Sequence, residues 1–360
     1  MPIRILHLLK GADVSNTAAS RIVLNLARHI DRQRHELSVW FLARGGPLAR
    51  EMEAAGCRTR VFNLFRGSRQ PMEALRFWRA VRSEAPAIIH QHFGGRSVRK
   101  LARWGCDGPV IVHLHSRGRE ACGSAPLEIA LSGVDAAIAV SRAVAEIVVG
   151  IPIKVIYPGV EVGEARCPRG QRPLVIGSAG RLVEIKGYTY LIQAMRPLMT
   201  EFPECRLEIA GDGPERAKLE AEVAAFGLCD RVSFLGWKPN IRSVMRNWDL
   251  YVQPSLEEGF GLAVLEAMAT GLPVVASASG GLVELIEHAS TGWLVPPGDS
   301  ATLGQCLQKA IRDFECLDAM GAAGRARVLR YFSAELMAAQ ISGIYDKILQ
   351  TPRTGSALQE

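Results

Sequence analysis

The residues best suited to chemistry lie in residues 254–266, where two glutamates bracket a glycine-rich segment. Glu258 and Glu266 stand eight positions apart, and the residues between them lead from a loop into a helix. A helix that begins at such a loop offers unpaired backbone amides and the positive end of its dipole, which suit a diphosphate. Carboxylates would repel phosphate, so we expect both to accept hydrogen bonds from hydroxyl groups. These groups together predict a site for a sugar attached to a nucleoside diphosphate.

Two cations follow a strand that we expect at residues 174–178. Gly180 permits a sharp turn after this strand, and Arg181 and Lys186 come from the loop that follows. Guanidinium and ammonium groups at a strand end suit a diphosphate, and surface ion pairs are the alternative. The neighbouring glycine-rich segment favours the diphosphate.

Histidines end two strands of the first half of the chain. The residues of interest there are His90, His92, Gly94, Arg96, His113 and His115. Alternation along a strand places His113 and His115 on the same face of the sheet. Imidazoles at strand ends suit acid–base chemistry or sugar binding, and a structural role is the alternative. We take His92, Gly94, Arg96 and His113 as candidate acceptor-binding residues.

Short apolar runs alternate with helix-length segments along the whole chain, which is typical of parallel sheets built from βαβ units. The expected strands are residues 3–9, 37–42, 58–62, 87–92, 110–113, 136–140 and 154–157, then 174–178, 206–210, 232–235, 250–252, 273–276 and 293–295. Residues 158–173 have the composition of a linker between two domains. Ligands of such sheets bind beyond the carboxyl ends of the strands, which is where the motifs lie.

Several motifs of the second half occur in the order and spacing of one enzyme family. They are Gly180-Arg181 to Lys186-Gly187, residues 210–215, Phe234-Leu235-Gly236, Glu258 to Glu266, residues 271–276, and Gly280-Gly281 with Glu284. This pattern resembles the retaining glycosyltransferases of family four (glycosyl transferases group 1). The resemblance implies an α/β protein of the GT-B fold, with two Rossmann-like, doubly wound domains facing each other across a cleft.

The resemblance also implies a division of the chain. Residues 1–160 would form an N-terminal acceptor-binding domain, and residues 161–332 a C-terminal domain that binds the nucleotide sugar. Residues 333–350, which overlap an amphipathic segment at residues 331–349, would form a helix that crosses back to the first domain. Residues 351–360 are expected to be a disordered tail.

Individual residues receive roles from the same resemblance. Arg181 and Lys186 would stabilise the charge that develops on the departing diphosphate. Glu258 and His115 would contact the transferred sugar, and Glu266 would bind the ribose. Arg181, Lys186, Glu258 and His115 are thus the catalytic candidates. The other donor-binding candidates are Gly11, Gly180, Gly213, Gly259, Phe260, Gly261 and Leu262.

The first half departs from the family pattern at one point. Family members carry a Gly-Gly pair before the first helix, where the backbone approaches the donor phosphates, and this chain has Thr17-Ala18. Gly11 or the amides of residues 15–17 are the substitutes that we expect.

No metal or cofactor is expected, because the nucleoside diphosphate sugar is itself a substrate. The chain holds no Asp-x-Asp pair, and its eight cysteines are scattered without a Cys-x-x-Cys pair. Cationic side chains and a helix dipole would neutralise the diphosphate in place of a metal ion.

The formal net charge of +7 at pH 7 comes from the first half, where positive residues are densest over residues 58–103. Arg76, Arg79 and Arg82 fall on one expected helix. A solvated helix face is one interpretation, and attraction to an anionic membrane or a phosphate-bearing acceptor is the other. Nucleic acid is excluded as a partner, because only 6% of residues are aromatic and no recognition motif accompanies the charge. Without a long apolar run we expect a cytoplasmic protein, with peripheral contact at the inner face of the membrane as the alternative.

The combined expectation is a retaining, metal-independent glycosyltransferase of the hexosyltransferase type. It would use a nucleoside diphosphate sugar, with UDP-linked donors favoured and GDP- or ADP-linked donors open. The expected acceptor is a hydroxyl of a glycan or lipid-linked glycan in cell-surface polysaccharide synthesis. Two alternatives stay open: a nucleotide-sugar epimerase of the same fold, and a sugar-nucleotide-binding protein without catalysis.

Overall fold

The computed structural model describes residues 2–11, 17–65, 70–93, 95–117, 131–166 and 174–350. Within these, the chain forms two compact units. The first unit combines residues 2–140, 144–159 and 334–350, and the second combines residues 141–143 and 160–333, apart from the undescribed gaps. The tail at residues 351–360 and part of the linker at residues 158–173 lie outside the described residues.

The first unit is built on a parallel sheet, with seven strands among the described residues in the order β3-β2-β1-β4-β5-β6-β7. The strands are β1 (Ile3–Gly11), β2 (His35–Arg44), β3 (Arg58–Val61), β4 (Ile88–Gln91), β5 (Val110–Leu114), β6 (Ala136–Ala139) and β7 (Ile153–Val155). The strand order reverses between β1 and β4, so their carboxyl ends form the topological switch point of this sheet.

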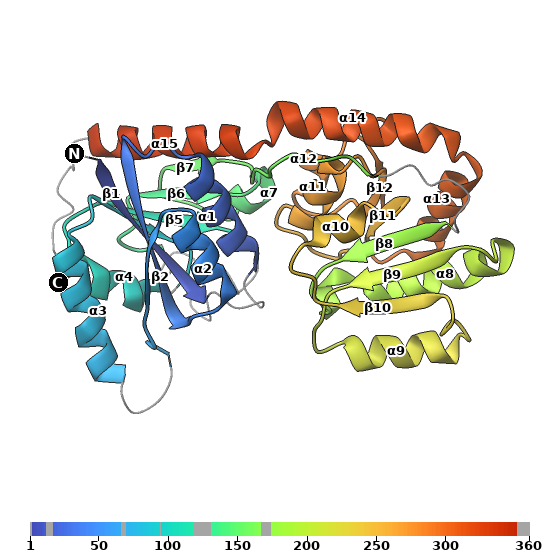
Figure 1. Cartoon of the computed structure of the whole chain (residues 1–360), viewed down its shortest axis with the longest axis horizontal. Helices are drawn as coiled ribbons and strands as arrows, with labels where there is room; N and C mark the ends of the chain where they lie inside the picture. The colour runs from blue at the N-terminus through green and yellow to red at the C-terminus, as the bar shows by residue number, and fades with distance from the viewer. Residues whose placement is uncertain are drawn as a thin grey trace. The chain divides into compact units, whose positions relative to one another are not determined.

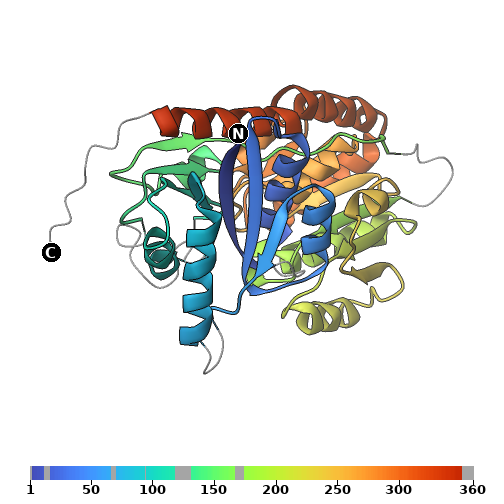
Figure 2. The same ribbon diagram turned by 60° about the vertical axis from the view of Figure 1, so that its left-hand side comes forward.

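Helices cover both faces of that sheet. They are α1 (Thr17–His29), α2 (Pro47–Ala54), α3 (Gln70–Glu84), α4 (Gly95–Arg103) and α15 (Ala334–Gln350). The short α7 (Arg142–Ala145) follows β6, and its first two residues belong to the second unit. Leu6 and Leu8 of β1 pack with Phe77 of α3 and Val98 of α4 on one face. Because side chains alternate along a strand, His7 points to the other face, where α1 and α15 lie side by side (Figures 1 and 2).

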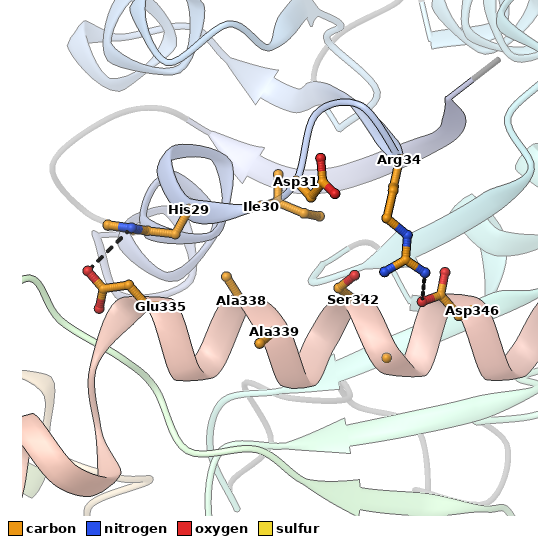
Figure 3. Close-up of a pocket in the computed structure, with 10 residues that line it drawn as sticks. His29, Ile30, Asp31, Arg34, Glu335, Ala338, Ala339, Ser342 and Asp346 are labelled. Carbon is orange, nitrogen blue, oxygen red and sulfur yellow. Dashed lines mark hydrogen bonds and ion pairs between the residues drawn. The ribbon is translucent and has the colours of Figure 1, made fainter.

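Helix α15 is fastened to the end of α1 and to the turn after it by side-chain contacts, which Figure 3 shows around a shallow pocket of about 280 Å³. Arg34 Nη2 lies 2.6 Å from Asp346 Oδ2, and His29 Nδ1 lies 3.5 Å from Glu335 Oε1. The helix predicted at residues 331–349 begins only at Ala334, because the preceding helix ends at Tyr331. The C-terminal helix therefore packs on the first unit.

The second unit has its own parallel sheet, with six strands among the described residues in the order β10-β9-β8-β11-β12-β13. The strands are β8 (Val175–Ala179), β9 (Arg206–Ala210), β10 (Val232–Gly236), β11 (Leu250–Gln253), β12 (Val274–Ser277) and β13 (Trp293–Val295). The order reverses between β8 and β11, so both units are doubly wound in the same way.

Helices cover this second sheet on both faces. They are η2 (Glu184–Lys186), α8 (Tyr188–Glu201), α9 (Arg216–Ala225), α10 (Ile241–Met245), α11 (Leu262–Ala269), α12 (Leu282–Leu285), α13 (Ser300–Arg312) and α14 (Glu315–Tyr331). The main core of the unit lies between the strands and α8, α9 and α13. Among the described residues, no helix has both the length and the apolar composition that a bilayer-spanning segment needs.

The predicted fold class is confirmed. Every strand predicted from the sequence is present, and the ends differ by one or two residues. Strands of parallel sheets are buried on both faces, so they read as short continuous apolar runs that are easy to recognise.

Candidate active site

Four loops of the second unit meet at the carboxyl ends of its central strands, and we call them the loop cluster. They are residues 180–187, 211–215, 254–261 and 278–281, which follow β8, β9, β11 and β12. Backbone hydrogen bonds join them: Leu182 N to Asp212 O at 2.9 Å, Leu256 N to Ile185 O at 2.8 Å, and Gly281 N to Glu258 O at 3.2 Å. Segments far apart in the sequence are thereby held in one rigid group.

Glycines in this cluster permit close contact between loops. A Cβ at Gly213 would lie 2.3 Å from the carbonyl oxygen of Leu182. A Cβ at Gly180 would lie 2.8 Å from the hydroxyl of Tyr188. Both positions were predicted to bind the donor, and packing alone already requires glycine at Gly213 because its neighbour is backbone.

The structure brings two of the catalytic candidates into direct contact. Lys186 Nζ lies 2.6 Å from Glu258 Oε2, and the two side chains are 20% and 12% exposed. A charge-assisted hydrogen bond with so little solvent around it fixes both groups. Sequence reasoning identified each residue but did not predict this ion pair.

A chain of side-chain hydrogen bonds that starts at Tyr251 orients Glu258. Tyr251 OH donates to Gln253 Oε1 at 2.7 Å, and Gln253 Nε2 donates to Ser255 Oγ at 2.8 Å. Ser255 Oγ in turn donates to Glu258 Oε2 at 3.2 Å. Burial raises the pKa of Tyr251 well above its usual value, so its hydroxyl stays protonated and can donate. The polar residues at alternate positions at the end of β11 were the signal for this chain, and sequence reasoning took only Ser255 from it.

The helix beside the cluster begins as expected. Gly261 adopts the left-handed conformation, with φ of 101°, and α11 starts at Leu262. The first amides of a helix have no acceptor within it, so they are oriented toward a ligand site. Phe260 is 3% exposed and its ring packs on Phe332, with centroids 5.6 Å apart, so only its backbone is available to a ligand.

The remaining donor candidates occupy different environments. Arg181 is exposed on the loop after β8, and Glu266 is half-buried in the second turn of α11. Gly259 is half-buried, and its carbonyl oxygen accepts a hydrogen bond from Ser141 Oγ at 2.7 Å. Gly11 is buried at the end of β1 in the first unit.

Other polar residues of the second unit have partners in the fold. Asp249 is fully buried, and its Oδ2 accepts from Val175 N at 2.9 Å. Glu284 accepts from the backbone amides of Arg142 and Ala143 at 3.0 and 3.1 Å, which caps α7. These bonds explain why residues 141–143 belong to the second unit, although they lie before the expected boundary at residue 160.

The acceptor candidates of the first unit are placed at the ends of β4 and β5. His92 and His115 are half-buried, with His92 Nδ1 lying 3.0 Å from His115 Nε2. His113 is only 3% exposed, which leaves His115 as the more accessible of the pair. Arg96 is exposed on α4, and Gly94 lies outside the described residues.

Burial of the His115 ring lowers its pKa to about 4. A general acid or base works best when its pKa is near the operating pH, so this ring is better suited to hydrogen bonding with hydroxyl groups. The lowered pKa therefore favours the sugar-binding alternative for His115 over acid–base chemistry.

Comparison with known proteins gives the same picture for both units. Residues 166–327 match the family model for glycosyl transferases group 1, and residues 19–164 match that for Glycosyltransferase Family 4. The chain is 33% identical over 172 residues to N-acetyl-alpha-D-glucosaminyl L-malate synthase of Bacillus anthracis, covering 48% of this chain and 45% of that protein. It is 34% identical over 210 residues to the lipopolysaccharide core biosynthesis mannosyltransferase LpsB of Rhizobium meliloti, covering 56% and 60%. The chain thus spans about half the length of the curated relatives it matches.

A solved structure extends the likeness to almost the whole chain. HepE of Anabaena, in complex with UDP and glucose, superposes with a TM-score of 0.83 at 24% identity, covering 96% of this chain and 99% of HepE. HepE has also been solved with UDP-glucose. Identity this low shows the fold alone. With both units matched by family models and the same doubly wound architecture throughout, the chain belongs to the glycosyltransferases of family four, group 1, and has the GT-B fold.

Proposed function

We propose that this protein transfers a sugar from a nucleoside diphosphate sugar to a hydroxyl acceptor. The observation that carries the proposal is the Lys186–Glu258 pair at the carboxyl ends of the second unit's strands, beside the beginning of α11. It sets a cation for the diphosphate next to a carboxylate for the sugar. The complexes of HepE with UDP and with UDP-glucose support a UDP-linked donor.

Lys186 and Glu258 each keep capacity for a ligand. An ammonium group has three N–H donors, and the bond to Glu258 uses one of them. Among the described residues, Lys186 and Ser255 both bond to Oε2 of the Glu258 carboxylate. In the proposed complex Oε1 accepts from a sugar hydroxyl, while Lys186 and Arg181 donate to the diphosphate.

The chemical step follows the retaining course that the family resemblance implies. The acceptor oxygen bonds to the anomeric carbon on the face from which the diphosphate departs, as the bond from that carbon to the diphosphate oxygen breaks. The hydroxyl proton passes to a phosphate oxygen of the leaving group. Lys186, Arg181 and the helix dipole of α11 stabilise the negative charge that develops there, so no metal ion is required.

The proposed acceptor is a glycan or lipid-linked glycan, which the name of LpsB supports as a class. The outer face of α3 supports contact with an anionic membrane. Met72 and Leu75 are 69% and 46% exposed there, next to Arg79 and Arg82. Exposed apolar and basic groups on one helix face suit the interface of a bilayer.

Sedimentation with anionic vesicles tests that contact. Replacing Arg79 and Arg82 with Glu should reduce the bound fraction severalfold, because each basic residue near such a surface contributes about 1 kcal/mol. Arg196→Glu, on the exposed side of α8 in the second unit, is the matched control and should leave binding unchanged. Equal binding of all variants would contradict the proposal.

Calorimetry tests the donor site without needing an acceptor. UDP, GDP, ADP and UMP are titrated into the full chain, and we expect UDP to bind with the highest affinity and UMP to bind much more weakly. An epimerase would release a rearranged sugar without any acceptor, and a non-catalytic protein would bind UDP-sugar without turnover. Absence of any nucleoside diphosphate binding would contradict the proposed function.

A further inference from the structure

Five of the chain's eight histidines line one face of the first unit's sheet, under α15, and we call them the histidine ladder. They are His7, His90, His92, His113 and His115. The register pairs His7 with His90 and places His90 beside Ile111, so positions two and four residues further along β5 share their face. Neighbouring rings are close, with centroids 4.7 Å apart for His7 and His90 and 4.5 Å apart for His90 and His92.

Three histidines of the ladder contact one another or a single tyrosine. His90 Nδ1 lies 2.7 Å and His7 Nε2 lies 3.3 Å from the hydroxyl of Tyr345 on α15. His7 Nδ1 lies 3.0 Å from His92 Nε2. His7 and His90 are fully buried, so bulk solvent does not reach these contacts.

One nitrogen in this group has nothing to bond. His90 Nε2 is buried and has no hydrogen-bond partner among the described residues. A buried polar atom left in this state costs about 1–3 kcal/mol, so an unexplained one points to a missing ligand.

We propose that His7, His90 and His92 form a site for one divalent cation of the Zn²⁺ class. One ring nitrogen of each lies within 4.8 Å of the others. Tetrahedral zinc with Zn–N bonds of 2.0–2.1 Å holds its ligand nitrogens about 3.3 Å apart, so His7 Nδ1 and His92 Nε2 need only a small separation. The orphaned His90 Nε2 is the third ligand, and the fourth position stays open.

The surroundings give each ligand the support that metal-binding histidines require. The second ring N–H of such a histidine is normally fixed by an acceptor, which sets the tautomer and the ring orientation. With the metal on the other nitrogen of each ring, His7 Nε2 and His90 Nδ1 would carry the ring proton, and they lie 3.3 and 2.7 Å from the Tyr345 oxygen. His92 Nδ1 would likewise carry its proton, 3.0 Å from His115 Nε2.

A second set, His92, His113 and His115, also places three ring nitrogens within 4.8 Å of one another. It shares His92 with the first set, and His113 Nδ1 and His115 Nδ1 are also buried without a hydrogen-bond partner among the described residues. Its members have no contact with Tyr345 among the described hydrogen bonds. Because the first set has an acceptor for every ligand, we assign the metal to it. A cation there ties β1 to β4 and, through Tyr345, to α15, while half-buried His92 provides the entry side.

Calorimetric titration of the full chain with Zn²⁺, after removal of metals with chelator, tests the site. We expect one ion per chain and a melting temperature that rises with the Zn²⁺ concentration. His92→Ala should weaken binding by at least about 100-fold, and Tyr345→Phe, which keeps the ring in the core, by about 10–100-fold. His288→Ala, at an exposed histidine of the second unit, is the matched control and should leave the affinity unchanged.

Three results would overturn the assignment. Loss of binding in His113→Ala with normal binding in Tyr345→Phe would move the metal to the second set. Equal weakening in His288→Ala, or binding without saturation, would show adventitious surface binding. No binding by the wild-type chain, with its fold verified by circular dichroism, would remove the site. Sugar transfer is not part of the readout, so failure of the proposed function leaves this test intact.

Discussion

The loop cluster of the second unit and the histidine ladder of the first unit occupy corresponding ends of two similar sheets, but they are assembled from different groups. The loop cluster pairs opposite charges, with Lys186 on Glu258, and fixes them with a hydrogen-bonded chain. The ladder stacks imidazole rings in the core and brings their nitrogens within hydrogen-bond distance of one another.

This contrast decides which ligands suit each region. A cation and a carboxylate held together with little solvent suit a ligand that is anionic at one end and hydroxylated at the other. Neutral imidazoles suit a borderline metal cation. The two regions can therefore be tested independently, since each should respond to its own ligand and ignore the other's.

The largest effect is expected at Lys186. Lys186→Ala should lower kcat/KM for sugar transfer by about 100-fold or more, because a preorganised donor to the developing negative charge is lost. Steady-state kinetics measures this effect. Lys218→Ala, at an exposed ion-paired lysine of the same unit, should leave the rate unchanged. Zn²⁺ affinity should be normal in Lys186→Ala, and a parallel loss of both would erase the distinction between the regions.

The next largest effect is expected at Tyr345, where a substitution should change the affinity for Zn²⁺ and not that for UDP. Tyr345→Phe should weaken Zn²⁺ binding by about 10–100-fold and leave UDP affinity unchanged, because only the ladder loses a hydrogen-bond acceptor. Both affinities are measured by calorimetry on the same preparation. A change in UDP affinity as large as that for Zn²⁺ would contradict the independence of the two regions.

Close backbone contact in the loop cluster should appear as a stability effect. Gly280 has a φ of +52°, and a Cβ there would lie 1.8 Å from the carbonyl oxygen of Glu258. Gly280→Ala should lower the free energy of unfolding by about 2–4 kcal/mol. Gly343→Ala in α15, where a Cβ meets nothing within 4 Å, should instead raise it by about 0.5–1 kcal/mol. Chemical denaturation that gives the same sign for both would refute this view of the cluster.

The smallest effect on activity is expected from Tyr251, which acts through Glu258 and is a positioning residue. Tyr251→Phe removes one hydrogen bond of the chain, worth about 1.4 kcal/mol, and should lower kcat about tenfold. UDP affinity should stay close to wild type, since the carboxylate serves the sugar. The unfolding midpoint should fall, because the buried hydroxyl also bonds the backbone of Ala179. A reduced UDP affinity with normal kcat would show that the chain serves nucleotide binding.

The sequence predicted the loop cluster better than the ladder, for a physical reason. Strand ends, glycine turns and the acid pair are local patterns, so Lys186, Glu258 and Gly261 could be placed at the correct strand ends. Their pairing across 72 residues depends on how two loops pack, which spacing does not encode. The Tyr251 chain was missed because a buried polar residue in an apolar strand resembles core packing.

The ladder depends on long-range register, which the sequence alone does not specify. His113 and His115 were correctly placed on one face because alternation is local. His7 joins them only because β1 pairs with β4. Tyr345, which is 255 residues from His90 in the sequence, joins them only because α15 packs on this sheet. Such clusters become visible once the sheet order is known.

The most direct test is whether Lys186, and no metal ion, stabilises the departing diphosphate. Release of UDP from a UDP-sugar is measured in excess EDTA for wild-type protein and for Lys186→Ala. We expect wild-type protein to release UDP in chelator, faster with a glycan acceptor, and the variant to be slower by about 100-fold. Wild-type turnover that disappears in EDTA and returns with added divalent metal, or equal rates for the two proteins, would contradict this expectation.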